Sequence, residues 1–234
     1  MKNTYEEIWK QLLEDIIKNG SIAEKDDAEL LEKIGNHVFI PNPYYNSGFT
    51  ELVSEKQFSE AIMIGAFDIE GYPLKGEALH DYVVSITDED KIYLDDDKSF
   101  IYTYPCRLVN YHNSINQLKV MLYRLIEHHG SNRAISTTLI PEWDSTREDI
   151  PCLQSLQCLI RNDEVILSCF FRSNDLYGAW VSNMMFLTYI GLLLTTNLKE
   201  YYPNLVFKGI DYHSSSLHIY KTDFEQAKKV VGLP

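Results

Sequence analysis

The longest apolar run in the chain covers residues 179–194, and it is interrupted at only three positions, Ser182, Asn183 and Thr188. The run is shorter than the ~20 apolar residues that a helix needs to cross a bilayer. A helix that is apolar on all sides must be covered on all sides by other elements. The sequence therefore predicts a helix over 180–195 that is buried in a core. The 234-residue chain is long enough to build that core without disulfides or metal ions.

Around this helix the sequence predicts an α/β (α+β) fold in one domain, residues 1–234. Apolar residues at helical period predict helices over 4–18 and 114–129. A short acidic helix is expected over 24–34, within a region, 20–57, that we expect to be a variable insertion or loop. Further expectations are strands over 58–70, 134–140, 156–160, 164–171 and 217–220, a short helix or strand over 76–86, and an exposed hairpin over 88–99. A capping box formed by Thr222 and Glu225 is expected to open the last helix.

The charge balance argues against two classes of partner. The chain carries 34 acidic and 21 basic residues, a net charge of -13. Nucleic acid and anionic membranes are both polyanions, which such a chain repels. A small anionic ligand needs only a few local cations, so any arginines that converge in the fold would matter. There are six of them, Arg107, Arg124, Arg133, Arg147, Arg161 and Arg172.

The cysteines show no pair with CxxC spacing and no cluster with histidine at zinc-ligand spacing; they are Cys106, Cys152, Cys158 and Cys169. Because the sequence shows no signal peptide, they predict reduced thiols in a cytoplasmic protein. Glycine-rich nucleotide loops, HExxH, GxSxG and EF-hand patterns are also absent. Candidate chemistry therefore rests on residues spread along the chain.

Cys152 and Arg172 are the first candidates. A lone cysteine is more often a small buried hydrophobe than a nucleophile, and a nearby cation would be needed to favour the thiolate of Cys152. Arg172 ends an apolar strand and is followed by Ser173. A planar fork of donors next to a hydroxyl suits a phosphate. The alternative for Arg172 is a surface ion pair with a nearby acid.

Three further residues extend the set. Asn183 lies inside the apolar helix, where a buried amide without partners costs ~1–3 kcal/mol. It either caps local backbone or presents its donor and acceptor to a ligand such as a pyrimidine edge. His218 and Tyr220 stand two apart in an expected strand, so they face the same side. A core histidine is the usual interpretation of one such ring, whereas two polar rings on one face suggest a site.

The order and approximate spacing of these motifs resemble those of the thymidylate synthase and pyrimidine nucleotide hydroxymethylase superfamily: Pro151-Cys152, then Arg172-Ser173-x-Asp175, then Asn183, then His218-Ile219-Tyr220. Upstream, Ser131-Asn132-Arg133-Ala134-Ile135 resembles the family's double-arginine strand start, and Tyr104-Pro105-Cys106-Arg107 resembles its tyrosine-containing turn. Gly71-Tyr72-Pro73-Leu74 followed by Leu79-His80-Asp81 is similar to its glycine–aromatic–proline turn and acidic helix. The likeness covers most of the chain, most strongly from about residue 113.

The resemblance implies a mixed β-sheet flanked by helices, with one sheet face forming the interface of a homodimer. It implies that Cys152 adds to C6 of a pyrimidine. Arg172 and Ser173 would hold the 5′-phosphate, and Arg172 would also help to keep Cys152 ionised. Arg133 would reach the phosphate of the nucleotide in the other subunit.

For the rest of the ligands, the resemblance implies the following roles. Asn183 would read the base edge, and His218 and Tyr220 would hold the ribose. Asp175 would contact the pterin of a folate. Tyr104 would lie near the C5 proton that is removed in the reaction.

The implied reaction is one-carbon transfer from 5,10-methylenetetrahydrofolate to C5 of a pyrimidine nucleoside monophosphate. A thiolate that adds to C6 makes C5 nucleophilic, and the protein supplies orientation and charge stabilisation. Hydride from the folate then gives a methyl group, as in methylation of dUMP, whereas water gives a hydroxymethyl group. Asp81 would organise water for the proton transfer, with Glu60 as a competing alignment.

Several positions depart from the family's pattern. Leu153 stands in place of a histidine, Asn132 in place of an arginine, Phe171 in place of a glutamine, and Ser215-Ser216 in place of Gly-Asp. The stretch from Asn42 to Thr50 contains no cation, although the family has a phosphate-binding arginine in its early loop. The chain also ends at Pro234, soon after its last helix, and we expect a less sealed site that favours hydroxymethylation. Asn183, in contrast, favours a uracil edge.

Three interpretations stay open at this point. The first is an enzyme, either a thymidylate synthase-type methyltransferase or a (d)CMP or dUMP 5-hydroxymethylase. The second is a non-catalytic nucleotide-binding homologue, and the third is a dimeric scaffold in which Cys152 is inert. Base, sugar and product are left to experiment.

Overall fold

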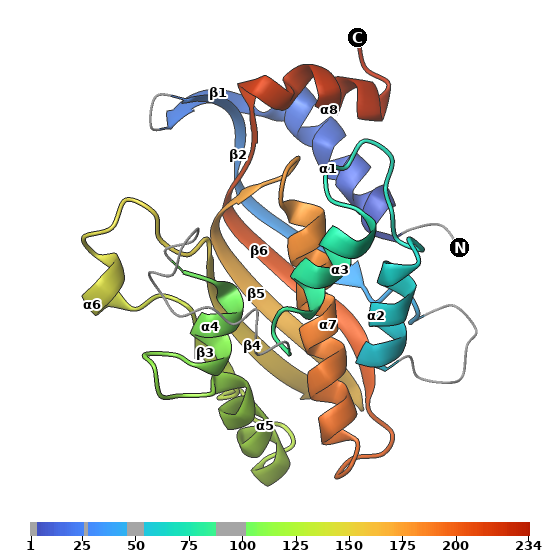
Figure 1. Ribbon diagram of the computed structural model, residues 1–234, viewed down its shortest axis with the longest axis vertical. Helices are drawn as coiled ribbons and strands as arrows, with labels where there is room; N and C mark the ends of the chain where they lie inside the picture. Colours follow the sequence, from blue (N-terminus) through green and yellow to red (C-terminus); the bar gives the residue numbers. More distant parts are fainter. Residues whose placement is uncertain (1–3, 26–27, 46–53, 88–101) are drawn as a thin grey trace.

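A six-stranded β-sheet is the frame of the computed structural model, which describes residues 4–25, 28–45, 54–87 and 102–234 (Figure 1). The strands lie in the order β1-β2-β6-β5-β4-β3. Their bounds are β1 Ser21–Lys25, β2 Ala28–Pro41, β3 Ile135–Thr137, β4 Leu153–Arg161, β5 Glu164–Asp175 and β6 Val206–Tyr220. All neighbouring pairs are antiparallel except β5 and β6, which run parallel. A mixed sheet with helices confirms the predicted α/β fold class.

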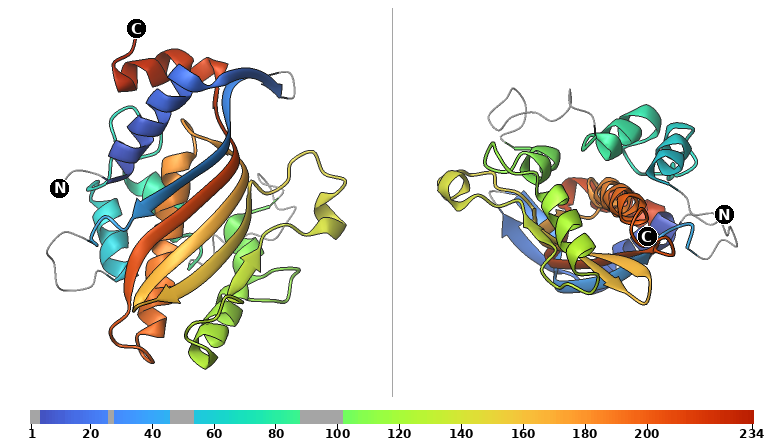
Figure 2. Two further views of the ribbon diagram at one scale, coloured as in Figure 1. Left: turned by 180° about the vertical axis from the view of Figure 1, so that it is seen from behind. Right: turned by 90° about the horizontal axis from the view of Figure 1, so that it is seen from below.

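Helices cover one face of this sheet, and the left view of Figure 2 shows that none of the drawn helices crosses the centre of the other face. The helices are α1 Thr4–Asn19, α2 Glu55–Met63, α3 Gly76–Val84, α4 Tyr104–Val109, α5 Gln117–Glu127, α6 Pro141–Asp144, α7 Trp180–Leu198 and α8 Phe224–Val231. A short 3-10 turn, Lys221–Asp223, leads from β6 into α8. The side chains of the core lie between the sheet and the helices.

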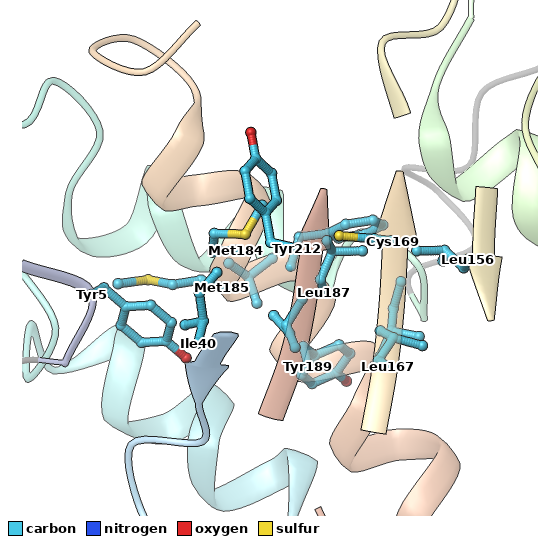
Figure 3. Close-up of a cluster of buried hydrophobic side chains, with 14 of the residues drawn as sticks. Tyr5, Ile40, Leu156, Leu167, Cys169, Met184, Met185, Leu187, Tyr189 and Tyr212 are labelled. Carbon is cyan, nitrogen blue, oxygen red and sulfur yellow. The ribbon is translucent and has the colours of Figure 1, made fainter. Parts of the chain in front are cut away.

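The helix α7 lies in the centre of the core, as its apolar sequence predicts. Figure 3 shows the layer that it forms with the sheet, including Met184, Met185 and Leu187 of α7, Leu167 of β5 and Tyr212 of β6. Burying one such apolar side chain contributes about 1.5–3 kcal/mol. By length and composition α7 could cross a membrane, but 83% of that stretch is buried inside the protein. Gly191 packs so closely on Phe207 that a Cβ there would lie 2.2 Å from the ring.

The parallel pair depends on α7. Parallel neighbours require a crossover connection of a dozen or more residues, and α7 provides it between β5 and β6. Both strands therefore end at the same edge of the sheet, where Ser173 is paired with Ser216 and Asp175 with His218. This pairing brings together two motifs that are far apart in the sequence.

The acidic helix expected near the amino terminus is wrong. Instead of an acidic helix over 24–34, β1 and β2 form a hairpin, and β2 pairs with β6 along most of its length. This backbone pairing outweighs the helix propensity of the glutamates and leucines. The region 20–57, expected to be an insertion or loop, thus contains both strands and the beginning of α2.

The strand expected over 58–70 is also wrong, because α2 covers Glu55–Met63. The helix begins with a capping box that was not recognised in the sequence. The Ser54 hydroxyl accepts a hydrogen bond from the Gln57 N–H, and the Gln57 side chain accepts one from the Ser54 N–H.

Most remaining elements agree with the sequence. Helices are confirmed at α1, α5 and α7, strands at β3, β4 and β5, and 76–86 is helical as α3. The strand expected over 217–220 is the end of the longer β6. The capping box with Thr222 is wrong, because Asp223 occupies the N-cap of α8 and no side chain caps that helix. The hairpin expected over 88–99 lies outside the described residues.

Candidate active site

A cavity of about 530 Å³ opens where β5 and β6 end, beside α3, α4 and α7. Ligand pockets in proteins have about this size. Eight of the ten residues singled out in the sequence line it, namely Asp81, Tyr104, Cys152, Ser173, Asp175, Asn183, His218 and Tyr220. Arg133 and Arg172 do not. The fold therefore collects side chains from widely separated parts of the chain around one space.

Cys152 differs from the other three cysteines, because it alone among them lines the cavity. It lies between Pro151 and the start of β4, partly exposed, with its Sγ 3.6 Å from the Ser173 Oγ. The others are buried, and burial raises the pKa of the Cys158 thiol to about 12. The interpretation as a buried hydrophobe fits those three thiols and not Cys152.

The Arg172 guanidinium holds the backbone that carries Cys152. It donates hydrogen bonds to the carbonyl oxygens of Pro151 at 3.1 Å and Ile150 at 2.6 Å. It also donates to the Ser173 Oγ at 3.2 Å. No carboxylate in the described ranges forms an ion pair with Arg172, so its charge stays beside the thiol and the serine hydroxyl. The Arg172 guanidinium and the Ser173 hydroxyl could together bind an anion. This arrangement does not fit the alternative considered above, in which Arg172 forms a surface ion pair.

Tyr104 begins the short helix α4, which Pro105 favours at its first turn and Thr103 caps by accepting a hydrogen bond from the Cys106 N–H at 3.2 Å. The Tyr104 hydroxyl accepts a hydrogen bond from the Leu153 N–H at 3.2 Å. Burial, with a further contribution from Cys152, raises the pKa of Tyr104 well above its ordinary value. The phenol therefore stays protonated near neutral pH and can donate or relay a proton.

A buried ion pair that no sequence pattern predicted fixes α4. The Arg107 guanidinium meets both carboxylate oxygens of Asp144 at 2.8 Å and donates to the Thr138 carbonyl at 2.9 Å. Burial is the largest single influence on the pKa of Asp144 and raises it, but the hydrogen bonds from Arg107 and the Ile140 N–H, together with the charges of Arg107 and Arg147, lower the pKa below its usual value. The pair ties the helix that begins with Tyr104 to the segment that follows β3.

The Asn183 side chain is fixed by two side chains rather than by local backbone. The Tyr82 hydroxyl donates to its Oδ1, and its Nδ2 donates to the Asn174 Oδ1 at 3.2 Å. Each of these contacts uses half of what a primary amide offers. One lone pair and one N–H remain, and together they match the adjacent N–H and C=O of a uracil edge.

His218 is buried and electrically neutral near pH 7. Burial, followed by the positive charge of Lys25, lowers the pKa of its imidazole to about 4. Its Nδ1 lies 3.4 Å from the Ser216 Oγ, and its Nε2 is buried without a partner among the described residues. The Tyr220 ring packs edge-on against it, with 5.1 Å between ring centroids. The two rings thus line the cavity together, and the His218 Nε2 is available for a hydrogen bond to a ligand.

Asp175 shapes the turn that leads from β5 to α7. Its Oδ1 accepts hydrogen bonds from the N–H groups of Tyr177 and Gly178, both at 3.0 Å. A Cβ at Gly178 would lie 2.5 Å from the other carboxylate oxygen, so glycine is needed there. Burial raises the pKa of Asp175 above its ordinary value. This carboxyl lines the cavity close to Lys25.

The remaining predicted residues belong to α2, α3 and the segment before β3. Asp81 of α3 lines the cavity, and its carboxylate lies 3.3 Å from the His80 Nδ1. Glu60, the competing alignment, is exposed on α2 and does not line the cavity. Arg133 is exposed just before β3, outside the cavity of its own chain.

Sequence reasoning missed other residues that line the cavity, including Lys25, Tyr82 and Asn174. Asn174 was the unspecified position in the Arg172-Ser173-x-Asp175 motif, and Tyr82 directly follows Asp81, so both stood next to a residue that was singled out. No sequence pattern pointed to Lys25, because its neighbours in the sequence are mainly acidic residues, which are typical of an exposed surface.

No family model matches the chain. Its sequence is similar to three archaeal proteins that are each named "Putative thymidylate synthase". The protein from Methanocaldococcus jannaschii is 31% identical over 234 residues, which cover 94% of this chain and 90% of that protein. The protein from Methanothermobacter marburgensis is 29% identical over 95% of this chain and 93% of its own length. The protein from Methanococcoides burtonii is 26% identical over 97% and 92%.

Proposed function

The chain belongs to a thymidylate synthase-like family, and from that premise we propose that it transfers a one-carbon unit from 5,10-methylenetetrahydrofolate to C5 of dUMP. The observation that carries this proposal is the position of Cys152. Of the four cysteines it alone lines the cavity, which the Asn183 amide, with one donor and one acceptor left, also lines. A nucleophile and a uracil-reading group in one cavity are what attack on C6 requires.

In this proposal the nucleotide is held at three points. Asn183 pairs with the base edge, His218 and Tyr220 contact the sugar, and the phosphate lies near Arg172 and Ser173. Attack by the Cys152 Sγ on C6 forms a carbon–sulfur bond and makes C5 nucleophilic. Orientation of the base relative to the thiol contributes much of the rate, because it replaces a random encounter with a fixed approach.

Once C5 has bonded to the transferred carbon, the proton on C5 must leave. Tyr104 is neutral and lies close to Cys152, so its hydroxyl can relay this proton through a hydrogen bond. Asp81 is partly open to solvent and can receive the proton through water. The final break of the carbon–sulfur bond releases Cys152 for the next turnover.

The residues present fit a folate in the remaining space. Tyr82, Tyr102 and Phe186 line the cavity and offer aromatic faces to a planar ring, and Asp175 would contact the pterin. When bound, the folate would supply the one-carbon unit and, for a methyl product, a hydride.

We expect the chain to convert dUMP into its 5-methyl product when it is incubated with 5,10-methylenetetrahydrofolate. The measurement is identification of the product by mass, with UMP, dCMP and CMP tested in parallel. A 5-hydroxymethyl product would mean that water, rather than hydride, reacts in the last step. Nucleotide binding without product would favour the non-catalytic homologue, and no ligand-dependent rise in Tm would favour the inert scaffold.

We further propose that a second copy of the chain covers the open face of the sheet. Ile135, Gln157, Ser168, Asp211 and Phe39 form one row across that face, each paired with the next. Ile135 is 56% exposed, and Phe170, in the next row, is 41% exposed. Exposed apolar side chains on a sheet face favour association, and Arg133 lies at the β3 edge of this face, where it could reach another subunit.

Phe170→Glu is therefore expected to convert dimers into monomers at micromolar concentration, because it replaces an exposed apolar side chain by a charge on the face that the second copy would cover. Light scattering coupled to gel filtration measures the mass. Ile64→Glu is the matched control, because Ile64 is 82% exposed at the end of α2, away from this face, and should leave the mass unchanged. A wild-type monomer would contradict the dimer without affecting the cavity argument.

A further inference from the structure

Lys25 is the only lysine or arginine among the described residues that line the cavity. The same lining contains three carboxyl groups, those of Asp81, Asp149 and Asp175. A phosphate monoester carries close to two negative charges near neutral pH. A cavity with three carboxyl groups and no cation would repel such a ligand. The positive charge of Lys25 therefore bears directly on whether an anionic ligand can enter.

The Lys25 ammonium has a defined position. It lies at the end of β1, where its Nζ is 3.3 Å from the Tyr220 hydroxyl and 5.9 Å from the centre of that ring. This contact uses one of its three N–H donors and leaves two. In the described part of the chain, no carboxylate forms an ion pair with it. The ammonium is thus oriented and still able to bind an anion.

Lys25 and Arg172 act on the same point of the cavity wall. Burial is the main cause of the lowered pKa of His218, the charge of Lys25 is the next, and Arg172 contributes in the same direction, while Glu32 opposes them. Both cations are therefore within electrostatic reach of the His218 ring. Arg172 also donates to the Ser173 hydroxyl, which lines the cavity. Two cations, Lys25 beside Tyr220 and Arg172 beside Ser173, therefore lie near lining residues of this cavity.

We propose that Lys25 binds the phosphate group of the nucleotide substrate, together with Arg172 and Ser173. This inference rests on the proposed function, from which it takes the nucleoside monophosphate. Lys25 would provide the cationic contact that the stretch 42–50 lacks. An ammonium–phosphate contact is a charge-assisted hydrogen bond, among the stronger contacts available to a ligand. The contact with Tyr220 would align the ammonium toward the phosphate.

The test compares the affinities of dUMP and deoxyuridine, which differ only in the phosphate, for wild type, Lys25→Met, Lys25→Arg and Lys221→Met. Calorimetry at constant salt gives each Kd. We expect Lys25→Met to weaken dUMP binding roughly ten- to a hundredfold, as for a lost hydrogen bond to a charged group, and to leave deoxyuridine unchanged. Lys25→Arg should recover most of the loss. Lys221→Met is the matched control, because Lys221 is exposed and paired with Glu29 and does not line the cavity.

Two outcomes would overturn the inference while leaving the proposed function in place. In the first, Lys25→Met binds dUMP as tightly as wild type does. In the second, it weakens dUMP and deoxyuridine equally, which would mean that Lys25 acts on the sugar through Tyr220. If wild-type protein binds neither compound, the inference and the proposed function fail together. Unchanged Tm values of the free variants establish that the differences come from binding.

Discussion

Replacing Cys152 by serine is expected to lower product formation by roughly a thousandfold or more, while nucleotide binding stays close to that of wild type. The reaction requires an anionic sulfur that attacks C6, and a serine hydroxyl is ionised far less readily than a thiol. The hydrogen-bond partner of the Cys152 Sγ among the described residues is the Ser173 hydroxyl at 3.6 Å, which is not a base that could activate an alcohol. Release of the C5 proton from labelled dUMP into water measures this step directly.

Cys158→Ala is the control for the loss of a thiol as such. Cys158 belongs to β4, the strand that directly follows Cys152, but it is buried in the core. The substitution should therefore cost some stability and leave turnover intact in the folded protein. Turnover by Cys152→Ser at near wild-type rate would exclude the covalent mechanism, whatever the product.

Replacing Asp144 by asparagine is expected to lower the free energy of unfolding by about 3–5 kcal/mol, because it removes the carboxylate that meets the buried Arg107 guanidinium. Arg107 is 1% exposed and meets Asp144 through two hydrogen bonds. Urea unfolding measures the change. The double variant Arg107→Met with Asp144→Leu should recover a large part of it, since replacing both charges by apolar groups removes the buried guanidinium as well.

Glu14→Gln is the matched control for this second prediction. It removes an ion pair of α1, with Lys18, in which both side chains are about half exposed. Such pairs contribute at most about 0.5 kcal/mol. If Asp144→Asn costs no more than Glu14→Gln, the buried pair does not stabilise the fold. Activity at temperatures well below the transition would also show whether α4 still places Tyr104 correctly.

The parts of the fold that the sequence predicted well are those decided by local pattern. The helix α7 is apolar on every side, and α1 and α5 carry clear stripes, so few alternatives were open to them. The order of the motifs around Cys152, Arg172 and His218 also predicted eight of the residues that line the cavity. Their roles in a reaction remain predictions until the nucleotide assays are done.

The parts that failed are decided by distant partners. The stretch 24–34 has the composition of a helix, but its residues 28–34 belong to a strand because β2 is paired with β6. Lys25 could not be singled out for the same reason, since its position against Tyr220 exists only after that pairing. Tyr82 and Asn183 are hydrogen-bonded although they are 101 positions apart in the sequence. Local sequence patterns do not predict such a contact.

The β5-α7-β6 unit has a consequence for the order in which the cavity forms. Ser173, Asn183 and His218 all belong to this one continuous segment, residues 164–220, whereas Lys25 and Tyr104 are contributed by distant parts of the chain. Closing a shorter loop costs less entropy than closing a longer one. We therefore expect the base- and sugar-contacting wall to assemble early in folding and to persist in partly unfolded states. The wall that carries Lys25 would join last and open first.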